Sequence, residues 1–181
     1  MTVPADALAV TRFWREAGAE KWFTKDEAFD DAFRSLCADL HMAAARRAFE
    51  SWLDHPESAL ALLLLLDQFP RNCFRDTGHM YATDPLARHY SRRALALGHD
   101  RVVEPELRVF FYLPLTHSED LADQEEAVKR NEPQGGPALE AAIDHRDIIA
   151  RFGRFPHRNP ILGRETTPEE RRFLDEGGFA G

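Results

Sequence analysis

The chain has 181 residues, of which 44% are hydrophobic and 30% are charged, and its formal net charge is −8. This length and composition are typical of a globular protein with one domain, and they exclude a disordered or fibrous chain. The acidic balance argues against binding to nucleic acid, because such binding needs a basic surface that replaces the counterions around phosphates.

The sequence predicts a protein of the reducing cytoplasm. Cys37 and Cys73 are too few for a disulfide framework, and they lack the Cys-x-x-Cys spacing of structural zinc. The opening MTVPADALAV lacks the basic flank and the long apolar core of a signal peptide. The apolar run ALALLLLL at 59–66 is far shorter than the roughly 20 residues of a membrane span. We therefore expect a buried helix in a soluble core, and no contact with a membrane.

The predicted elements are helices, and the first two begin at recognisable start signals. TKDE at 24–27 has the pattern of a capping box, in which Thr24 caps the helix and Glu27 reaches back. Apolar residues spaced three and four apart follow it as far as Leu40. HPE at 55–57 then places a proline at the start of the leucine-rich helix.

Four later segments carry the same kinds of signal. DPLARHYSRRALALG at 84–98 begins with Asp84 as the cap and ends at a glycine. THSE at 116–119 and TPEE at 167–170 are two more capping boxes, and a Gly-Pro step at 136–137 opens the helix between them. We expect seven or eight helices in all.

One stretch leaves the choice between strand and helix open. RVFFYLPL at 108–115 has strand-like composition, but its proline and the Glu-Leu pair before it fit a short buried helix at least as well. No other stretch alternates apolar and polar residues convincingly. We therefore expect an all-α fold of antiparallel helix pairs, forming a single domain over residues 1–176 with a short loose tail at 177–181.

Two similar polar corners follow apolar helices. FPRNCFRDT at 69–77 and FPHRNPILGRET at 155–166 share the order Phe-Pro, Arg-Asn and Arg-acid-Thr, although chance could explain the likeness. Proline disfavours helical geometry in the residue before it, so each Phe-Pro step should close the preceding helix. Asn72 and Asn159 can then be ordinary helix caps, or they can face a ligand.

Arginines at these corners suggest an anion site. A guanidinium at the edge of an apolar helix needs carboxylates, carbonyls or a ligand anion. Asp67, Glu119 and Asp147 are candidate internal partners, and a structural ion-pair network is one reading. The other is a pocket for a phosphate or carboxylate, with Arg164 at its edge. Its candidate ligand-binding residues are Asp67, Gln68, Arg71, Asn72, Arg154, Arg158 and Asn159.

Histidines supply the candidate catalytic groups. Proton transfer could involve His117, His145 or His157 together with Glu119, but a lone inward histidine such as His145 is often only a core residue. No pair has the spacing that places two metal ligands on one helical face, and no Gly-x-Ser-x-Gly elbow presents a nucleophile. The sequence therefore predicts no metal and no cofactor, and it does not specify a reaction.

Several motifs together resemble a known family. FW at 13–14, KWFTKDEAFD, LLLLLDQFPRN, FYLPLTHSE and FGRFPHRNPILGRETTPEE are similar, in this order, to members of the DUF924 family of bacteria and plants. The resemblance implies an all-helical, tetratricopeptide-like α/α superhelix and implies no activity. The chain departs from the family near Arg47, where we expect a glycine.

Two functions are compatible with these features. The first is a soluble helical protein that binds a small anionic ligand in a polar pocket built by DQFPRN, HSE and GRFPHRN. The alternative is an interaction scaffold without catalytic activity, whose concave groove binds a peptide. Exposed aromatic residues would then line the groove, and the candidates are Phe13, Trp14, Trp22 and Trp52. The corners could also be purely architectural. The sequence does not predict an oligomeric state.

Overall fold

A computed structural model describes residues 2–181 of the chain. In this part of the chain every regular element is a helix and no strand occurs, so the prediction of an all-α fold is confirmed. The chain forms two compact units. Unit 1 runs to Arg75 and resumes at His79–Pro114, whereas unit 2 comprises Asp76–Gly78 and Leu115–Gly181. The single domain over 1–176 and the tetratricopeptide-like arrangement stay predictions.

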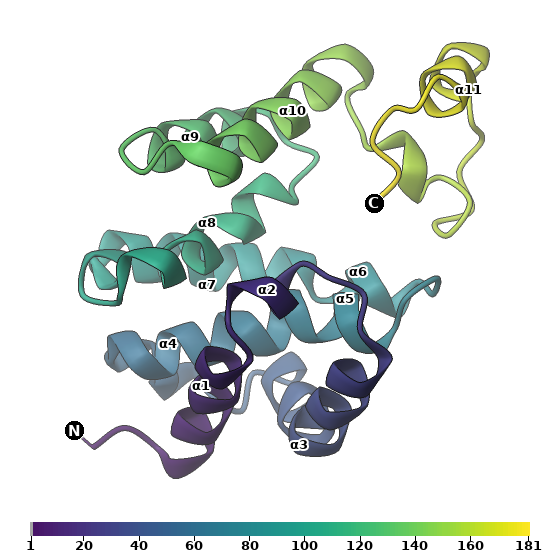
Figure 1. The fold of residues 1–181 in the computed structure, drawn as a ribbon. Helices are drawn as coiled ribbons and strands as arrows, with labels where there is room; N and C mark the ends of the chain where they lie inside the picture. Colours follow the sequence, from purple (N-terminus) through teal and green to yellow (C-terminus); the bar gives the residue numbers. More distant parts are fainter. Residues whose placement is uncertain (1) are drawn as a thin grey trace. The chain divides into compact units, whose positions relative to one another are not determined.

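The helices follow one another with short connections (Figure 1). The described chain has eleven α-helices, of which eight have eight residues or more, whereas seven or eight helices were expected in all. Unit 1 holds α1 (Ala5–Ala17), α2 (Ala19–Trp22), α3 (Glu27–Ala45), α4 (Pro56–Leu63), α5 (Phe69–Cys73), α6 (His79–Ala82), α7 (Asp84–Ala96) and most of α8 (Val109–Thr116). Unit 2 holds α9 (Leu121–Asn131), α10 (Gly136–Phe152) and α11 (Pro168–Asp175). Short 3-10 helices span Glu50–Asp54, His99–Arg101, Pro105–Leu107 and Pro156–Arg158.

Helices begin near each predicted start, but two starts are displaced along the chain and only one of the three capping boxes forms. Thr167 accepts from the backbone N–H of Glu170 and completes the box that opens α11. Asp26 caps α3 in place of Thr24, whose hydroxyl instead donates to the carbonyl of Glu20. Asp120 caps α9, because Thr116 still belongs to α8. The ambiguous stretch at 108–115 therefore forms a helix rather than a strand.

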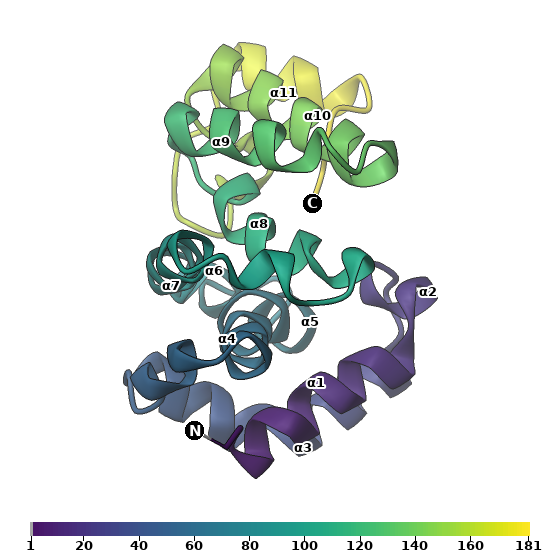
Figure 2. The same cartoon turned by 90° about the vertical axis from the view of Figure 1, so that its left-hand side faces the viewer.

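The leucine-rich helix α4 lies inside unit 1, as predicted. Leu60 and the five leucines from Leu62 to Leu66 are each at most 1% exposed. The helix lies between α1 on one side and α7 on the other (Figures 1 and 2). None of the helices in the described chain is long and apolar enough to cross a membrane.

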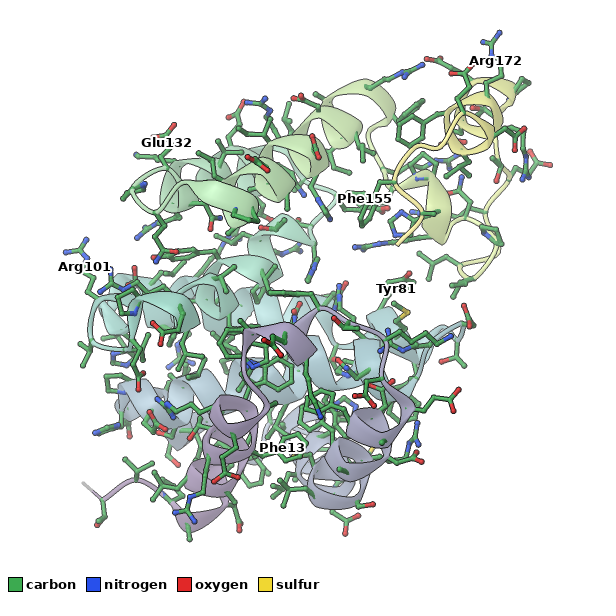
Figure 3. The ribbon with its side chains drawn as sticks, viewed as in Figure 1. Phe13, Tyr81, Arg101, Glu132, Phe155 and Arg172 are labelled. Carbon is green, nitrogen blue, oxygen red and sulfur yellow. The ribbon has the colours of Figure 1, made fainter. Side chains whose placement is uncertain are left out.

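Aromatic residues near the start of the chain fill the core of unit 1. Trp14, Trp22 and Trp52 are buried, with exposed fractions of 0%, 7% and 4%. Phe13, which is labelled in Figure 3, stacks on Phe29 of α3 at 5.1 Å between ring centres. These aromatic residues therefore stabilise the fold and do not line an exposed groove.

The prediction that Phe69-Pro70 closes the leucine helix is wrong. The backbone stays helical from Pro56 through a π-helical turn (Leu64–Gln68) into α5. The N–H of Phe69 bonds to the carbonyl of Leu64, five residues earlier. A regular helix would direct the ring of Pro70 against the carbonyl of Leu66, and the wider turn relieves that clash.

The second Phe-Pro step does not end its helix either. Helix α10 stops at Phe152, because Gly153 adopts the left-handed conformation with φ 69°. Phe155 is already extended, with φ −88° and ψ 110°, and Pro156 opens a 3-10 turn. The glycine three residues before Pro156 therefore ends the helix, and the Phe-Pro step shapes the loop that follows.

The backbone at Arg47 explains why a glycine was expected there. Arg47 has φ 64°, in the left-handed region that favours glycine. The N–H of Ala48 bonds to the carbonyl of Ala43, and the N–H of Arg47 bonds to the carbonyl of Ala44. These two bonds form the Schellman ending of α3. The chain therefore keeps the turn geometry without the residue that adopts it most easily.

In unit 2, α9 and α10 lie side by side (Figures 1 and 2). Ile148 and Ile149 of α10 pack with Phe155 of the following loop, which is labelled in Figure 3. Phe152 and Phe173 cover this small core, and Phe173 comes from α11. Helix α11 is thus held to α10 by aromatic contact.

Candidate functional site

The DQFPRN corner lies in unit 1, where its arginine is held by two carboxylates. Arg71 donates two hydrogen bonds to Asp84, of 2.8 and 2.9 Å, and lies 3.2 Å from Asp67. Gln68 donates to the other oxygen of Asp67 at 2.6 Å. Burial alone would lower the pKa of Arg71, but the two carboxylates raise it overall. Asp67 was an expected partner, whereas Asp84 was expected only to cap α7.

Asn72 belongs to a separate buried group in unit 1. Its side-chain amide donates to Asp30 of α3 at 2.7 Å, and Arg75 bonds to the same carboxylate at 3.0 Å. Asn72 therefore does not cap a helix. It ties α5 to α3.

The GRFPHRN corner lies in unit 2, where two of its polar residues converge on one glutamate. Arg154 donates to both oxygens of Glu170, at 2.6 and 2.9 Å, and Asn159 donates to one of them at 3.2 Å. The hydrogen bond from Arg154, followed by the N–H of Thr167, lowers the pKa of Glu170 to about 2. This glutamate also completes the capping box of α11, so the group anchors that helix.

Glu119 and Arg164 hold the loop at Phe155 in place. Arg164 donates to both oxygens of Glu119, at 2.7 and 3.0 Å, and to the carbonyl of Phe155. The N–H of Phe155 donates to Glu119 at 2.8 Å. Burial alone would raise the pKa of Glu119, but these donors lower it. The guanidinium of Arg158 lies over the Phe155 ring, 4.5 Å from its centre.

The three predicted histidines lie close together in unit 2, two of them against Phe155. The ring centre of His145 lies 6.3 Å from that of His117 and 5.4 Å from that of Phe155. The ring of His157 lies 5.6 Å from Phe155 on the same measure. The structure therefore brings together the four candidates for proton transfer, His117, Glu119, His145 and His157.

The protonation of two of these histidines follows from their surroundings. The Nδ1 of His145 lies 2.7 Å from the carbonyl of Ala141, and since a carbonyl only accepts, this nitrogen carries the proton. Burial, followed by the charge of Arg158 and the neighbouring histidines, lowers the pKa of His157 to about 3. His157 is therefore neutral near pH 7.

A pocket of about 370 Å³ opens beside this group, entirely within unit 2. Its walls combine phenylalanines with polar residues on one face of α10. The lining residues are Ala141, Asp144, His145, Asp147, Ile148, Arg151, Phe152, Phe173 and Phe179. Among the predicted site residues only His145 lines it. Asp147, which was a candidate partner of the corner arginines, instead forms an ion pair with Arg146 at 2.7 Å.

Phe179 is one of the pocket residues that the sequence reasoning missed. Its ring centre lies 4.5 Å from that of His145 and 5.0 Å from that of His157. Gly178 makes this possible, because a Cβ there would lie 2.5 Å from the carbonyl oxygen of Phe173. A single aromatic residue after two glycines was the available signal, and we had treated 177–181 as a loose tail.

Other groups in the described chain offer less. No set of three His, Cys, Asp or Glu side chains within residues 2–181 is arranged to hold a metal ion. Cys37 and Cys73 are buried, and burial raises the pKa of each thiol to about 12, so neither is a reactive thiolate. A second pocket in unit 1, of about 430 Å³, is crossed by the ion pairs of Arg15 with Glu57 and Glu104.

Comparison with known proteins places this fold in a family without an assigned activity. A solved structure of a protein of unknown function from Agrobacterium tumefaciens is 60% identical in sequence, with a TM-score of 0.93. The likeness covers 94% of this chain and 97% of that one. No curated protein matches the chain. Residues 10–178 match the family described as bacterial protein of unknown function (DUF924), and the chain therefore belongs to that family.

Proposed function

We propose that this protein binds a small organic ligand in the pocket of unit 2. The observation that carries the proposal is the pocket itself, whose volume of about 370 Å³ falls within the range of small-molecule sites. Its walls are three phenylalanine rings, an isoleucine and an alanine, with a histidine and three charged residues among them. Apolar walls with a few convergent polar groups are the usual composition of such sites.

The apolar wall would hold the body of the ligand. Phe152 and Phe173 already pack on the core of unit 2, with 5.1 Å between their ring centres. Phe179 faces them from the segment after α11 and is 39% exposed. A flat or aromatic ligand could therefore pack against ordered rings and would cover apolar surface that is now partly open to water.

His145 is the group through which the pocket could support chemistry. Its Nδ1 is engaged by the carbonyl of Ala141, so Nε2 is the nitrogen that can accept a proton. Imidazole is the commonest general acid and base in enzymes. We therefore propose that any proton transfer at this site involves His145. His157 lies near it but does not line the pocket.

A polar anion pocket built by DQFPRN, HSE and GRFPHRN has less support. Arg71, Arg154 and Arg164 each bind a carboxylate through two hydrogen bonds. A ligand anion would have to displace those carboxylates and leave them without their cation. The interaction scaffold loses its main argument as well, because the tryptophans that were expected to line a groove are buried. Two unpaired thiols are compatible with the proposed cytoplasmic location.

A ligand screen with a blocked pocket tests the proposal. Ala141 is exposed and lines the pocket, so Ala141→Phe should fill the space without removing a core contact. Ala150 is exposed on the same helix but does not line the pocket, and Ala150→Phe is the matched control. A library of cationic, neutral and anionic fragments would be followed in ¹H–¹⁵N spectra. We expect hits that shift signals of Phe152, Phe173 and Phe179 in the wild type and the control but not in Ala141→Phe. Fragments that bind Ala141→Phe as well as they bind the wild type would contradict the proposal.

A further inference from the structure

We infer that the pocket of unit 2 selects organic cations, such as a ligand with an ammonium or guanidinium head on a small apolar body. The inference rests on the proposed function and adds the class of ligand. It follows from the charges on the rim of the pocket and from the faces of its aromatic walls. It reverses the expectation of an anionic ligand that the arginine-rich corners suggested.

The charged groups on the rim carry a negative balance. Asp144 and Asp147 lie one helical turn apart on α10 and line the pocket with a single arginine, Arg151. Asp147 shares its charge with Arg146 at 2.7 Å. The side chain of Asp144 has no hydrogen-bond or ion-pair partner among the residues that the structure describes. A positively charged ligand would find a carboxylate there that no internal cation has taken.

The aromatic walls already hold one cation. The guanidinium carbon of Arg151 lies 4.6 Å from the centre of the Phe152 ring and 5.8 Å from that of Phe173. Both distances are within the roughly 6 Å at which a cation is attracted to a ring face. These two rings are thus placed to contact a cationic group, and Phe179 supplies a third ring on the same pocket.

Arg151 can leave this position at small cost. Its ion pair with Glu169 is 3.0 Å long, but the two side chains are 53% and 55% exposed. Exposed ion pairs of this kind contribute little to stability. A ligand cation could therefore take the ring faces while Arg151 turns to the solvent with Glu169.

Three probes with one phenylpropyl body and different heads test the charge preference directly. These are 3-phenylpropylammonium, 3-phenylpropanol and 3-phenylpropionate, titrated against the full chain by calorimetry and ¹H–¹⁵N spectra. We expect the ammonium to bind tighter than the propionate by on the order of tenfold. The double variant Asp144→Asn with Asp147→Asn should remove most of that preference. Asp175→Asn, exposed on α11 and outside the pocket, is the control that should leave it unchanged.

Arg151→Gln should change the affinity in opposite directions for a cationic and for an anionic ligand. If the ligand is a cation, vacating the ring faces should raise the affinity for the ammonium by a few-fold. If the ligand is an anion, losing the guanidinium should weaken the propionate instead and leave the ammonium weak. Arg172→Gln, on the exposed face of α11, controls for the change in net charge.

The outcomes separate this inference from the proposed function. Tighter binding of the propionate or of the alcohol at the pocket would overturn the cation preference while the ligand pocket stands. The inference would also be overturned if the double variant Asp144→Asn with Asp147→Asn bound the ammonium as tightly as the wild type does. Absence of binding by all three probes, with fragments found only elsewhere on the protein, would overturn both.

Discussion

The backbone N–H of Phe69 donates to the carbonyl of Leu64, five residues earlier, and this bond opens the leucine-rich helix by one residue. The carbonyls that a regular helix would use are taken by side chains from other segments. His41 of α3 bonds to Leu65 through Nδ1 at 2.8 Å, and Thr83 donates to Leu66 at 2.6 Å. The π turn thus explains how Pro70 stays inside a helix, and it makes the corner depend on two distant residues.

The hydrogen bond from the hydroxyl of Thr83 to the carbonyl of Leu66 should stabilise unit 1, because Pro70 has no N–H that could bond to that carbonyl. Thr83→Val leaves a buried carbonyl without a donor, and we expect it to lower the free energy of unfolding by about 1–3 kcal/mol. In the double variant with Pro70→Ala, the new N–H at position 70 can bond to Leu66, so the loss should shrink. Chemical denaturation of the four proteins of this cycle measures the coupling.

Strictly additive effects of Pro70→Ala and Thr83→Val would contradict this description of the π turn. Ser35→Ala serves as the control for losing a hydroxyl. Its hydroxyl also donates to a backbone carbonyl, that of Asp31, but the site is exposed and a regular helix surrounds it. We expect a much smaller effect there than at Thr83.

Replacing Arg47 with glycine should stabilise the protein. The left-handed backbone at this position, with φ 64°, is unfavourable for arginine and easy for glycine. The ion pair between Arg47 and Glu50 is lost, but both side chains are about half exposed, and such pairs contribute little. We expect the melting temperature to rise by roughly 2–4 °C. Arg46→Gly, at the preceding residue whose φ of −84° suits any residue, should lower it, and a gain for both variants would exclude backbone strain as the cause.

The lowered pKa of His157 should make the protein less stable in acid. The folded-state pKa is about 3 and the ordinary value is 6.5, so between these limits the unfolded chain binds the proton and the folded chain does not. The contribution of His157 to stability is complete above pH 6.5 and is lost as the pH falls towards 3. We expect stability to drop by up to roughly 1.4 kcal/mol per pH unit in this window. His157→Asn should flatten the profile between pH 6 and 4.5, whereas an unchanged slope would show that His157 is not the group responsible.

Gly178 should control the position of Phe179. Any side chain at Gly178 would clash with the carbonyl of Phe173. Gly178→Ala should therefore move the segment after α11, so that Phe179 loses its contact with His145. We expect the proton signals of the His145 ring to lose their ring-current shift, and the affinity of pocket ligands to fall by a few-fold. Gly177→Ala is a less specific control, because it tests only the positive φ of 87°. Unchanged signals of His145 in Gly178→Ala would mean that Phe179 does not depend on this contact.

The sequence predicted helices well where local signals decide them. Three such signals act within one helical turn and have the expected effect. Pro56 begins α4, Gly98 follows the end of α7, and the capping box of Thr167 begins α11. Pro70 was misread because its effect depends on Thr83 and on His41, which are distant in sequence. The local sequence predicts the clash of the proline ring with the preceding turn. It does not show that distant side chains bond to the carbonyls that the wider turn leaves without a backbone partner.

The candidate site was predicted in part for a similar reason. His117, Glu119, His145 and His157 come together in unit 2, where the loop before α9, helix α10 and the 3-10 turn after α10 meet at Phe155. The arginines were candidates for an anion pocket or for a structural ion-pair network, and the spacing of residues could not reveal that Asp84 binds Arg71 and Glu170 binds Arg154. Phe173 and Phe179 carried no motif, so the apolar walls of the pocket became visible only in the structure.

A crystal structure of the wild-type protein with the tightest-binding fragment tests the central claim most directly. We expect density for the ligand between Phe152, Phe173 and Phe179, with its polar head within reach of Asp144 or His145 and Arg151 displaced from the rings. Crystals of Ala141→Phe grown with the same fragment should show none at this position. A ligand bound outside the pocket, or a pocket that stays empty at saturating fragment, would contradict the proposed function.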